Sequence, residues 1–388
     1  MLPAVVVDST RAFAYQWIIW RIFGLHPPEG NTFWAQHYQA YGIIINLITN
    51  VHVPMSFYIE CLLSSNLTEF CESFYLTSVV LVEQVKYFNV WRIRGQLKRF
   101  HQILHHLDGR LQHQSERDIV EQHIELVTRI FLGLFRWFVI ILTSSMLFVA
   151  CTAEQELAFP TWYPWDWQRS NRVYLFTVIW QTLSLYSLAL MTLSNDTYPM
   201  SYMTMVAGHY RALAQRVSMI GHGRESQSLA YEQLIDCIRD HQIILLQFIF
   251  RLVSIIQDTM SSVFFYQFAC TACSICTFAF YIFFVKVSFS KLLHLFFMFV
   301  AIVFETFIIC YATEDIGLGA EQLYHAIYAC NWLDQSIEFR RTLLLMLNRA
   351  QRSVTIVAAH SMPVRMTTFL AVIKTAYSMF TLLNKIKS

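Results

Sequence analysis

The final apolar stretch, residues 363–383, limits what this chain can fold into more than any other feature. As a helix, these 21 residues would reach about 31 Å, close to the roughly 30 Å of a bilayer's hydrocarbon core. Apolar residues follow one helical face, and the opposite face carries hydroxyls and one lysine, namely Thr367, Lys374, Tyr377, Ser378 and Thr381. Because an unpaired lysine is costly in lipid, this polar stripe is expected to face protein or a water-filled path.

The composition indicates an integral membrane protein. Of the 388 residues, 56% are hydrophobic and 14% are charged, with a mean hydropathy of +0.42, which is far more apolar than a soluble protein. The net charge of +2 is too small to favour nucleic acid as a partner. No Gly-rich phosphate loop and no Ser/His/Asp or Cys/His arrangement stands out, so we expect neither an enzyme nor a cofactor.

Seven apolar segments predict seven transmembrane helices, and the fold class is therefore an all-α membrane protein. The expected spans are residues 34–61 (with a kink at Pro54), 68–91, 130–151, 173–205, 254–285, 292–312 and 363–383. The three polar connections are helical in pattern and predict extensions beyond the membrane that form an anchor domain, the last with an amphipathic helix at 321–348. The Pro- and Trp-rich segment 152–172 predicts an interfacial lid.

Charge predicts the orientation of these spans. With the N-terminus cytosolic, 20 Lys and Arg residues lie inside and 6 outside, as the positive-inside rule requires. The sequon at Asn66 then lies outside and is a candidate glycosylation site, whereas the sequon at Asn195 would lie within a span. The predicted division is an N-terminal segment lying along the inner surface (1–32), transmembrane pairs (33–91, 130–205, 254–312), cytosolic connections (92–129, 206–253, 313–355), and a last span with a short extracellular tail (356–388).

Several polar residues invite more than one interpretation. Glu83 and Glu305 lie within spans, and a structural hydrogen bond is favoured over an ion-conducting role. His101, His105 and His106 favour a solvated helix face over a zinc pair, and Cys270, Cys273 and Cys276 diverge too far around a helix to share an ion, so no metal site is expected. Cys61, Cys71 and Cys151 would lie near the outer surface, where both free thiols and a disulfide are possible.

The end of the chain resembles a known family. The run Ala376-Tyr-Ser-Met-Phe-Thr-Leu-Leu383, preceded by Leu343-Leu-Leu-Met-Leu-Asn-Arg-Ala-Gln-Arg352, is similar to the C-terminal signature of insect odorant receptors. The chain departs from that pattern at Ser353, where a proline is expected. Over the rest of the chain the resemblance is one of length, hydropathy and loop pattern.

The resemblance implies a function and a set of residues. It implies the ligand-binding subunit of an odorant-gated, non-selective cation channel, assembled as a heterotetramer with the odorant co-receptor, Orco, in the plasma membrane of olfactory neurons. The last helix would line the pore with Lys374, Tyr377 and Thr381, with a gate at Phe380 and Asn384 at the outer mouth. The subunit interface would include Tyr324, Tyr328, Trp332, Arg340 and Arg341, whose aromatic and arginine side chains suit such an anchor.

The outer halves of the spans supply candidate ligand contacts. The selected residues are apolar or aromatic with a few hydroxyls: Phe74, Tyr75, Ser78, Thr143, Met146, Ala150, Tyr174, Val178, Phe299 and Ile302. This composition suits a small volatile organic odorant, because buried area gives affinity and one or two hydrogen bonds give orientation. Ordinary helix packing remains the alternative for each of them.

Three other classes of membrane protein are alternatives. A G-protein-coupled receptor needs an external N-terminus, which the charge count opposes, and lacks support from an Asp/Glu-Arg-Tyr or Asn-Pro-x-x-Tyr motif. A gustatory-receptor-like homomeric channel fits the C-terminal pattern less well. A transporter predicts internal repeats with broken spans, and none is found.

Overall fold

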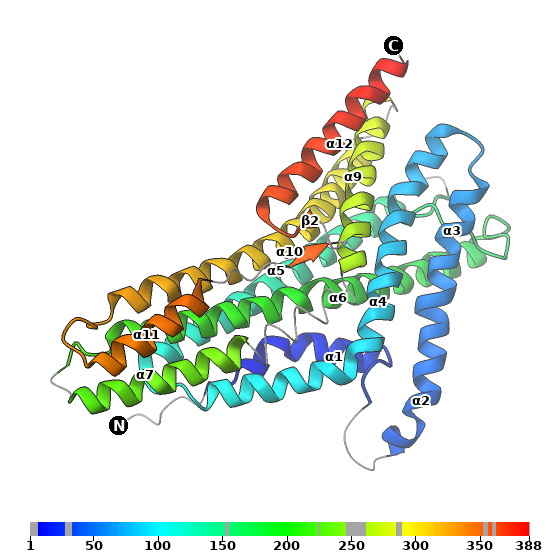
Figure 1. Cartoon of the computed structure of the whole chain (residues 1–388). Coiled ribbons are helices and arrows are strands. Elements are labelled where there is room, and N and C mark those ends of the chain that lie inside the picture. The colour runs from blue at the N-terminus through cyan, green and yellow to red at the C-terminus, as the bar shows by residue number, and fades with distance from the viewer. Residues whose placement is uncertain are drawn as a thin grey trace.

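Four long helices form the frame of the molecule and run into one common end (Figure 1). They are α4 (Leu67–Asp108), α5 (Gln114–Cys151), α6 (Asn171–Met219) and α10 (Phe289–Ala329). The structure is a computed structural model, and it describes residues 7–27, 33–151, 155–223, 226–245, 261–284, 289–351, 356–358 and 362–387.

Shorter elements complete the described chain. Those before α4 are η1 (Ser9–Phe13), α1 (Ala14–Ile22), α2 (Phe33–Asn46), the π-helical η2 (Leu47–His52) and α3 (Val53–Leu63). Those after α6 are α7 (Gln227–Gln242), α9 (Ser261–Phe284), α11 (Ile337–Ala350), the antiparallel pair β1 (Val357–Ala358) and β2 (Met362–Pro363), and α12 (Met366–Lys387). The α12 helix packs beside α9 and α10 and points away from the end that holds α7 and α11 (Figure 1).

Local sequence signals set several helix starts. The side chains of Asn66, Ser170, Ser226 and Ser336 each accept a hydrogen bond from a backbone N–H in the first turn of α4, α6, α7 and α11 respectively. Such N-caps satisfy donors that a helix start otherwise leaves unpaired. The capping residues therefore fix where these helices begin.

The predicted irregularity at Pro54 takes the form of a π-helical turn. The N–H of Val53 donates to the carbonyl of Ile48, five residues earlier, because Pro54 has no N–H and its ring disfavours the ordinary α pattern. The segment η2 joins α2 to α3 without a break, so residues 36–63 remain one candidate span.

Four described helices are long and apolar enough to cross a membrane: residues 36–63, 114–147, 171–219 and 296–329. Residues 263–276 and 366–382 form shorter apolar helices. The expected span 68–91 is absent from this set because Glu69, Glu72, Glu83 and Lys86 interrupt its apolar composition. The helical membrane fold is thus shown, while the orientation and the exact spans remain predictions.

Two features of the last 70 residues differ from the sequence prediction. The predicted helix 321–348 is wrong, because α10 ends at Ala329 and α11 starts at Ile337. The turn between them is held from outside, since the Asn331 N–H donates to the Ile220 carbonyl at 3.0 Å. The last helix starts at Met366 rather than Pro363, because Pro363 pairs with Val357 in the β-strand pair. Ser353 lies outside the described residues.

The segment α1 was expected to lie along the membrane surface, but one of its faces packs against α6. The Trp20 indole donates to Asn195 at 3.1 Å, and the Gln16 amide donates to Thr197 at 3.2 Å. Its other face leaves Ile18 and Ile22 exposed. The helix is therefore docked on the protein by its polar and aromatic side, and part of its apolar side is exposed.

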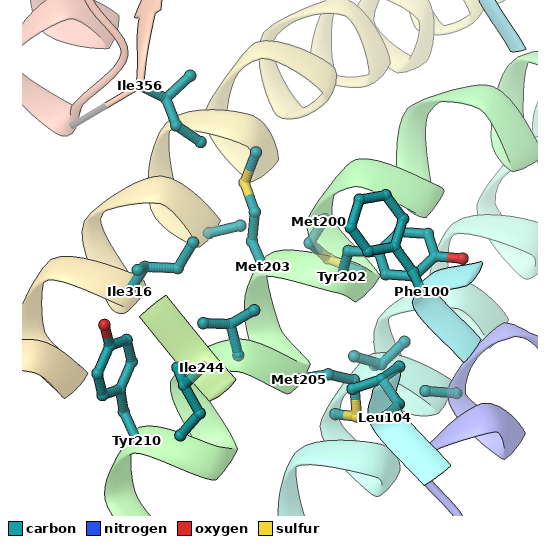
Figure 2. Close-up of a cluster of buried hydrophobic side chains, with 14 of the residues drawn as sticks. Phe100, Leu104, Met200, Tyr202, Met203, Met205, Tyr210, Ile244, Ile316 and Ile356 are labelled. Atoms are coloured by element: carbon teal, nitrogen blue, oxygen red, sulfur yellow. The ribbon is translucent and has the colours of Figure 1, made fainter. Parts of the chain in front are cut away.

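The end of the molecule that contains the continuations of α4, α5, α6 and α10 together with α7 and α11 is called the anchor (Figure 1). The larger of two hydrophobic clusters lies here and reaches toward α12. Figure 2 shows its centre, where Phe100 lies beside Tyr202, with ring centroids 5.4 Å apart, and Met203 lies between α6 and α10. Because the packing is close, loss of even one methylene group from these side chains lowers the stability of the protein.

Buried ion pairs reinforce the anchor. The Arg216 guanidinium donates to both carboxylate oxygens of Glu116, at 3.0 and 2.5 Å, and to Asp240 at 2.6 Å. Arg211 pairs with Asp315 at 2.5 Å, which joins α6 to α10. Bidentate arginine–carboxylate geometry is among the strongest polar contacts available to a protein.

Candidate ligand site and pore helix

A second hydrophobic cluster lies away from the anchor and gathers side chains from six helices and a loop. Its buried members are Val53, Phe57, Leu76, Val80, Leu142, Phe159, Leu185, Phe278 and Ile302. They come from α3, α4, α5, the loop 155–170, α6, α9 and α10. We call this group the second cluster, and it is the region where the sequence predicted a ligand site.

The loop 155–170 closes the second cluster. Gln181 of α6 holds it by accepting from the Ala158 N–H at 3.1 Å and donating to the Phe159 carbonyl at 2.9 Å. The Trp162 N–H donates to the Ser56 carbonyl at 3.0 Å, which ties the loop to α3 as well. Phe159 is 3% exposed, so the segment expected to be a lid is packed into the protein.

A small cavity adjoins the second cluster between α4, α9 and α10. It has a volume of about 10 Å³, roughly that of one water. Its lining mixes apolar and polar groups: Val79, Val82, Gln267, Cys270, Thr271, Ser274, Ile302 and Glu305. Ser274 and Ser78 share a hydrogen bond of 2.6 Å. The Gln267 carbonyl oxygen is buried and has no hydrogen-bond partner among the described residues.

Four of the predicted ligand residues lie at or beside this region. Ile302 belongs to the second cluster and lines the cavity. Ser78 reaches the cavity lining through Ser274, and Phe299 stacks on Phe278 with ring centroids 5.3 Å apart. Met146 packs against the second cluster and accepts a hydrogen bond from Thr182 at 2.8 Å.

Other predicted ligand residues lie elsewhere. Thr143 is exposed and shares a 3.2 Å hydrogen bond with Tyr186, while the Tyr174 hydroxyl donates to the Glu156 carbonyl at 2.9 Å. Phe74 stacks on Phe70, and Val178 is half-buried outside the second cluster. The side chains of Tyr75 and Ala150 lie outside the described residues.

Sequence reasoning missed the contribution of α9. Gln267, Thr271, Ser274 and Phe278 recur at helical spacing and lie on one face of that helix. This periodicity was visible in the sequence, but the ligand prediction drew on the second, third, fourth and sixth spans alone.

A buried ionic cluster joins α4, α6 and α10 beside the cavity. The Lys86 ammonium donates to Asp196 at 2.5 Å and also to Glu305. The Asn195 amide donates to Glu83 at 2.6 Å. The carboxylates singled out from the sequence thus have partners, which supports their structural interpretation.

Lys86 corrects the charge count that predicted the orientation. It was counted as cytosolic, but it is 6% exposed inside the bundle, so the asymmetry becomes 19 to 6 once this one residue leaves the 20. Its partners were separated by 110 or more residues along the chain and were not paired from sequence. Asn195, of the second sequon, is 1% exposed and is therefore inaccessible to glycosylation.

The helix α12 presents most of its predicted polar stripe at the surface of the chain. Ala376 is 1% exposed and Val372 7%, and Phe369 meets Phe307 of α10 edge-on at 5.6 Å. The stripe residues Thr367, Lys374, Tyr377 and Ser378 are exposed, and Phe380 and Thr381 are half-buried. The side chain of Asn384 lies outside the described residues.

The hydroxyls of α12 bond to their own helix. Ser378 donates to the Lys374 carbonyl at 3.0 Å, and Thr381 donates to the Ser378 carbonyl at 2.8 Å. Such local bonds satisfy the hydroxyl donors. Met379 lies on the face of α12 that was predicted to be apolar, but its side chain is 36% exposed.

The predicted interface residues do not share one helix. Tyr324 and Tyr328 lie on α10 with their rings edge-on at 5.7 Å, Trp332 lies in the turn against the anchor core, and Arg340 and Arg341 are exposed on α11. Tyr328 is 56% exposed. Exposed apolar residues accompany them on the turn and α11: Leu333, Ile337, Leu344 and Leu345.

The remaining predicted sites are placed as follows. Asn66 is exposed and caps α4, accepting from the Glu69 N–H at 2.9 Å. Cys61, Cys270, Cys273 and Cys276 are free thiols, and the side chains of Cys71 and Cys151 lie outside the described residues. The described residues contain no group of three or more His, Cys, Asp or Glu arranged to hold a metal ion.

His101 corrects the prediction of a solvated histidine face. Its ring accepts a hydrogen bond from the Trp17 indole at 3.0 Å and packs against Phe13, with ring centroids 5.1 Å apart. Burial lowers the pKa of His101 to about 4. His105 and His106 are exposed, as expected.

The long apolar helices and their packing define a helical membrane protein. The sequence matches the family model of the 7tm odorant receptors over residues 66–377. It is 38% identical to Odorant receptor 19a of Drosophila melanogaster over 98% of this chain and 97% of that one, and 31% identical to Odorant receptor 2a of the same fly over 98% of each. The chain belongs to the odorant receptor family.

A solved structure shares the fold. The insect olfactory receptor OR5 from Machilis hrabei matches with a TM-score of 0.80 at 17% identity, covering 97% of this chain and 100% of that one. The same receptor in complex with eugenol matches with a TM-score of 0.77 at 15% identity, with 97% of each chain covered.

Proposed function

We propose that this chain is the ligand-binding subunit of a heteromeric, odorant-gated, non-selective cation channel formed with the odorant co-receptor, Orco. Its ligand is a small volatile organic molecule bound at the second cluster, and its cation pathway is lined by α12. The channel lies in the plasma membrane of olfactory neurons, with the N-terminus cytosolic. Family membership and the arrangement of α9, α10 and α12 support this proposal.

The observation that carries the proposal is that the same two helices serve both regions. The helix α10 contributes Ile302 to the second cluster and, five residues later, Phe307 to the contact with Phe369 of α12. The helix α9 contributes Ser274 to the cavity lining and also packs against α12. A displacement at the ligand site is therefore transmitted to the pore helix through direct packing.

The small size of the cavity suggests how a ligand acts. About 10 Å³ holds roughly one water, so an odorant enters only if α4, α9 and α10 move apart or their side chains repack. Met146 and Met298, which pack against the second cluster, supply adaptable side chains. A ligand that binds the expanded state better shifts the population toward it.

We assign the gate to Phe380. Lys374 adds a positive charge to the same cation pathway. A lysine on the pathway repels cations if every subunit carries one. If this chain joins co-receptor subunits without a lysine at that position, the repulsion is diluted, and water in the inner vestibule screens it further.

Co-expression tests the proposal. Cells that express this chain with the co-receptor are expected to give cation current to some member of an odorant panel, whereas cells with this chain alone are not. Phe380→Ala should raise the current without odorant, with Leu229→Ala, an exposed apolar residue on α7 of the anchor, as the control. Odorant current from the chain alone would favour the homomeric channel, and an unchanged Phe380→Ala channel would overturn the gate assignment.

Glycosylation at Asn66 tests the orientation separately. Thr68→Val removes the sequon but keeps the Asn66 side chain that caps α4. An endoglycosidase should shift the mobility of the natural chain and leave this variant unshifted. A cytosolic signal from a tag placed beside Asn66 would contradict the orientation.

A further inference from the structure

A cavity of about 790 Å³ opens on the side of the molecule between the end of α1, α2 from Gln36 to Asn46, and the middle of α4. Its lining combines Gly24, Tyr38, Ile43, Asn46, Trp91 and Arg94. It is separate from the second cluster and from α12, so neither ligand binding nor the cation pathway accounts for it.

Hydrogen bonds between side chains of α2 and the end of α1 form the base of this cavity. The last carbonyls of α1 lack intrahelical partners, as at any helix end. Here the Tyr38 hydroxyl donates to the Arg21 carbonyl at 2.8 Å, and the Asn46 amide donates to the Phe23 carbonyl at 3.3 Å. Two side chains of α2 therefore fix the end of α1.

A close backbone approach tightens the same junction. Gly24 has a φ of +78°, and a Cβ added there would lie 2.6 Å from the Cα of Gly42. Glycine is thus required at position 24 both for the conformation and for the space. The cavity is consequently a built feature rather than a loose gap between helices.

One wall of the cavity is apolar and open. Phe88 and Trp91 stack at 5.9 Å, and they are 57% and 46% exposed. Ile43, across from them on α2, is 63% exposed. These three side chains lie within the predicted spans 34–61 and 68–91, where an exposed apolar wall suits contact with acyl chains.

The positively charged side chain of Arg94 lies at one edge of this apolar wall. The Arg94 guanidinium lies 5.4 Å from the centre of the Trp91 ring and donates to the Leu25 carbonyl at 3.2 Å. A guanidinium has five N–H donors, so this one carbonyl bond leaves donors for an anion. The stacking holds the planar group in place, which favours binding of a phosphate oxygen pair.

The position along the bundle indicates the membrane boundary. The candidate span of α2 begins at Gln36, and the expected span of α4 ends at Trp91. Trp and Tyr side chains concentrate at this level of a bilayer. Arg21 is exposed nearby, so its charge and that of Arg94 complement an acidic leaflet.

We propose that this cavity binds one phospholipid with an acidic headgroup from the inner leaflet of the membrane. Its phosphate accepts hydrogen bonds from Arg94, and its acyl chains lie along Phe88, Trp91 and Ile43. A free phosphate ion would leave the apolar wall unused, and a neutral lipid would leave the surrounding positive charge uncompensated. Such a lipid would tie α1 to α2 and α4 on the side away from α12.

Photo-crosslinking in nanodiscs tests the lipid site. The full-length chain is reconstituted with a phosphatidylserine probe that carries a diazirine in its acyl chain, and labelled peptides are mapped by mass spectrometry. Labelling should concentrate on residues 36–47 and 85–94. Arg94→Gln should reduce it about tenfold, as expected for losing charged hydrogen bonds, and Arg94→Lys should reduce it less.

Arg92→Gln is the matched control, because Arg92 is exposed two residues away and does not line the cavity. Unlabelled phosphatidylserine should compete, and neither phosphatidylcholine nor inorganic phosphate should. Equal labelling by a phosphatidylcholine probe, displacement by inorganic phosphate, or equal loss in Arg92→Gln and Arg94→Gln would overturn the proposal. All readings are taken without odorant, so they are independent of the channel assay.

Discussion

The anchor and the second cluster are built by different physical means from the same long helices. In the anchor, buried ion pairs such as Arg216 with Glu116 and Asp240 add to a large aromatic and methionine core. In the second cluster, contacts between helices are mainly apolar, with neutral hydroxyl pairs such as Ser78 with Ser274. We therefore expect the second cluster to repack at lower cost than the anchor, whose charges require one geometry.

This difference suits a receptor that changes shape. Breaking a buried, hydrogen-bonded ion pair is costly because a charge is left without a partner. Exchanging apolar contacts among Leu142, Phe278 and Ile302 costs far less, since apolar packing has no directional requirement. Movement on ligand binding is therefore expected near the second cluster, with the anchor as the fixed end.

The largest expected effect is in the anchor. Arg216→Ala leaves Glu116, which is 0% exposed, without its cation and leaves Asp240 with Arg110 as its remaining ion-pair partner, so it should lower the unfolding free energy by about 3–5 kcal/mol. Thermal melting of the detergent-purified chain, followed by size-exclusion chromatography, measures the loss. The exposed Arg129, which pairs only with Glu125 within α5, gives the control Arg129→Ala. Equal melting of the two variants would contradict the comparison.

Lys86→Met tests the boundary between the two regions. Its loss strands Asp196 and Glu305, and we expect a destabilisation of about 3 kcal/mol, somewhat less than for Arg216→Ala. The double variant Lys86→Met with Glu305→Gln should recover part of the stability in the same melting assay. If the double variant recovered no stability, the unpaired carboxylate of Glu305 would not be the cause of the destabilisation in Lys86→Met.

Acidification should weaken the anchor through its buried histidines. Burial lowers the pKa of His241 to about 4 and that of His209 to about 3 in the folded protein. In the unfolded chain the histidine pKa is about 6.5, so below this pH the unfolded chain binds more protons than the folded one. Stability therefore falls as pH drops from about 6.5 toward 4, by about 1–2 kcal/mol at pH 5 for His241.

The melting temperature measured at pH 7.5 and pH 5 checks this expectation. His241→Phe keeps the ring beside Tyr210 and should make the melting temperature less dependent on pH. His241 is the better probe, because burial raises the pKa of Asp108, next to His209, to about 6 and opposes the effect there. If the melting temperature of His241→Phe depended on pH as much as that of the natural chain, His241 would not be a cause of the acid destabilisation.

The smallest expected effect is at the proposed ligand site. Ser274→Ala removes the hydrogen bond to Ser78 and should cost about 1 kcal/mol of stability, while changing the half-maximal odorant concentration about fivefold. Thr143→Ala is the control, because Thr143 was predicted from sequence to contact the ligand but is exposed on α5. Equal shifts in the two variants would remove the distinction between cavity and surface.

Sequence predicted the general design correctly because that design depends on local patterns. Apolar segments of bilayer length, polar helical connections and the family signature near residues 343–383 together gave an all-helical membrane fold of the odorant receptor family. The caps at Asn66, Ser170 and Ser336 are local signals too, but they were not used to predict helix starts, and the predicted helix 321–348 ran through Ser336. These features need no knowledge of which helices are neighbours.

The tertiary structure alone decided which distant residues meet. Lys86 was read as a cytosolic charge until Asp196 and Glu305 were found beside it, 110 and 219 residues away. The ligand prediction omitted α9 and included the exposed Thr143, because periodicity gives the faces of one helix but not their partners. The sequence by itself determined the helical class and the family, whereas packing determined the ionic cluster, the cavity and the turn at 330–336 that divides the predicted helix 321–348. Those features depend on contacts across the chain, and local sequence does not encode such contacts one residue at a time.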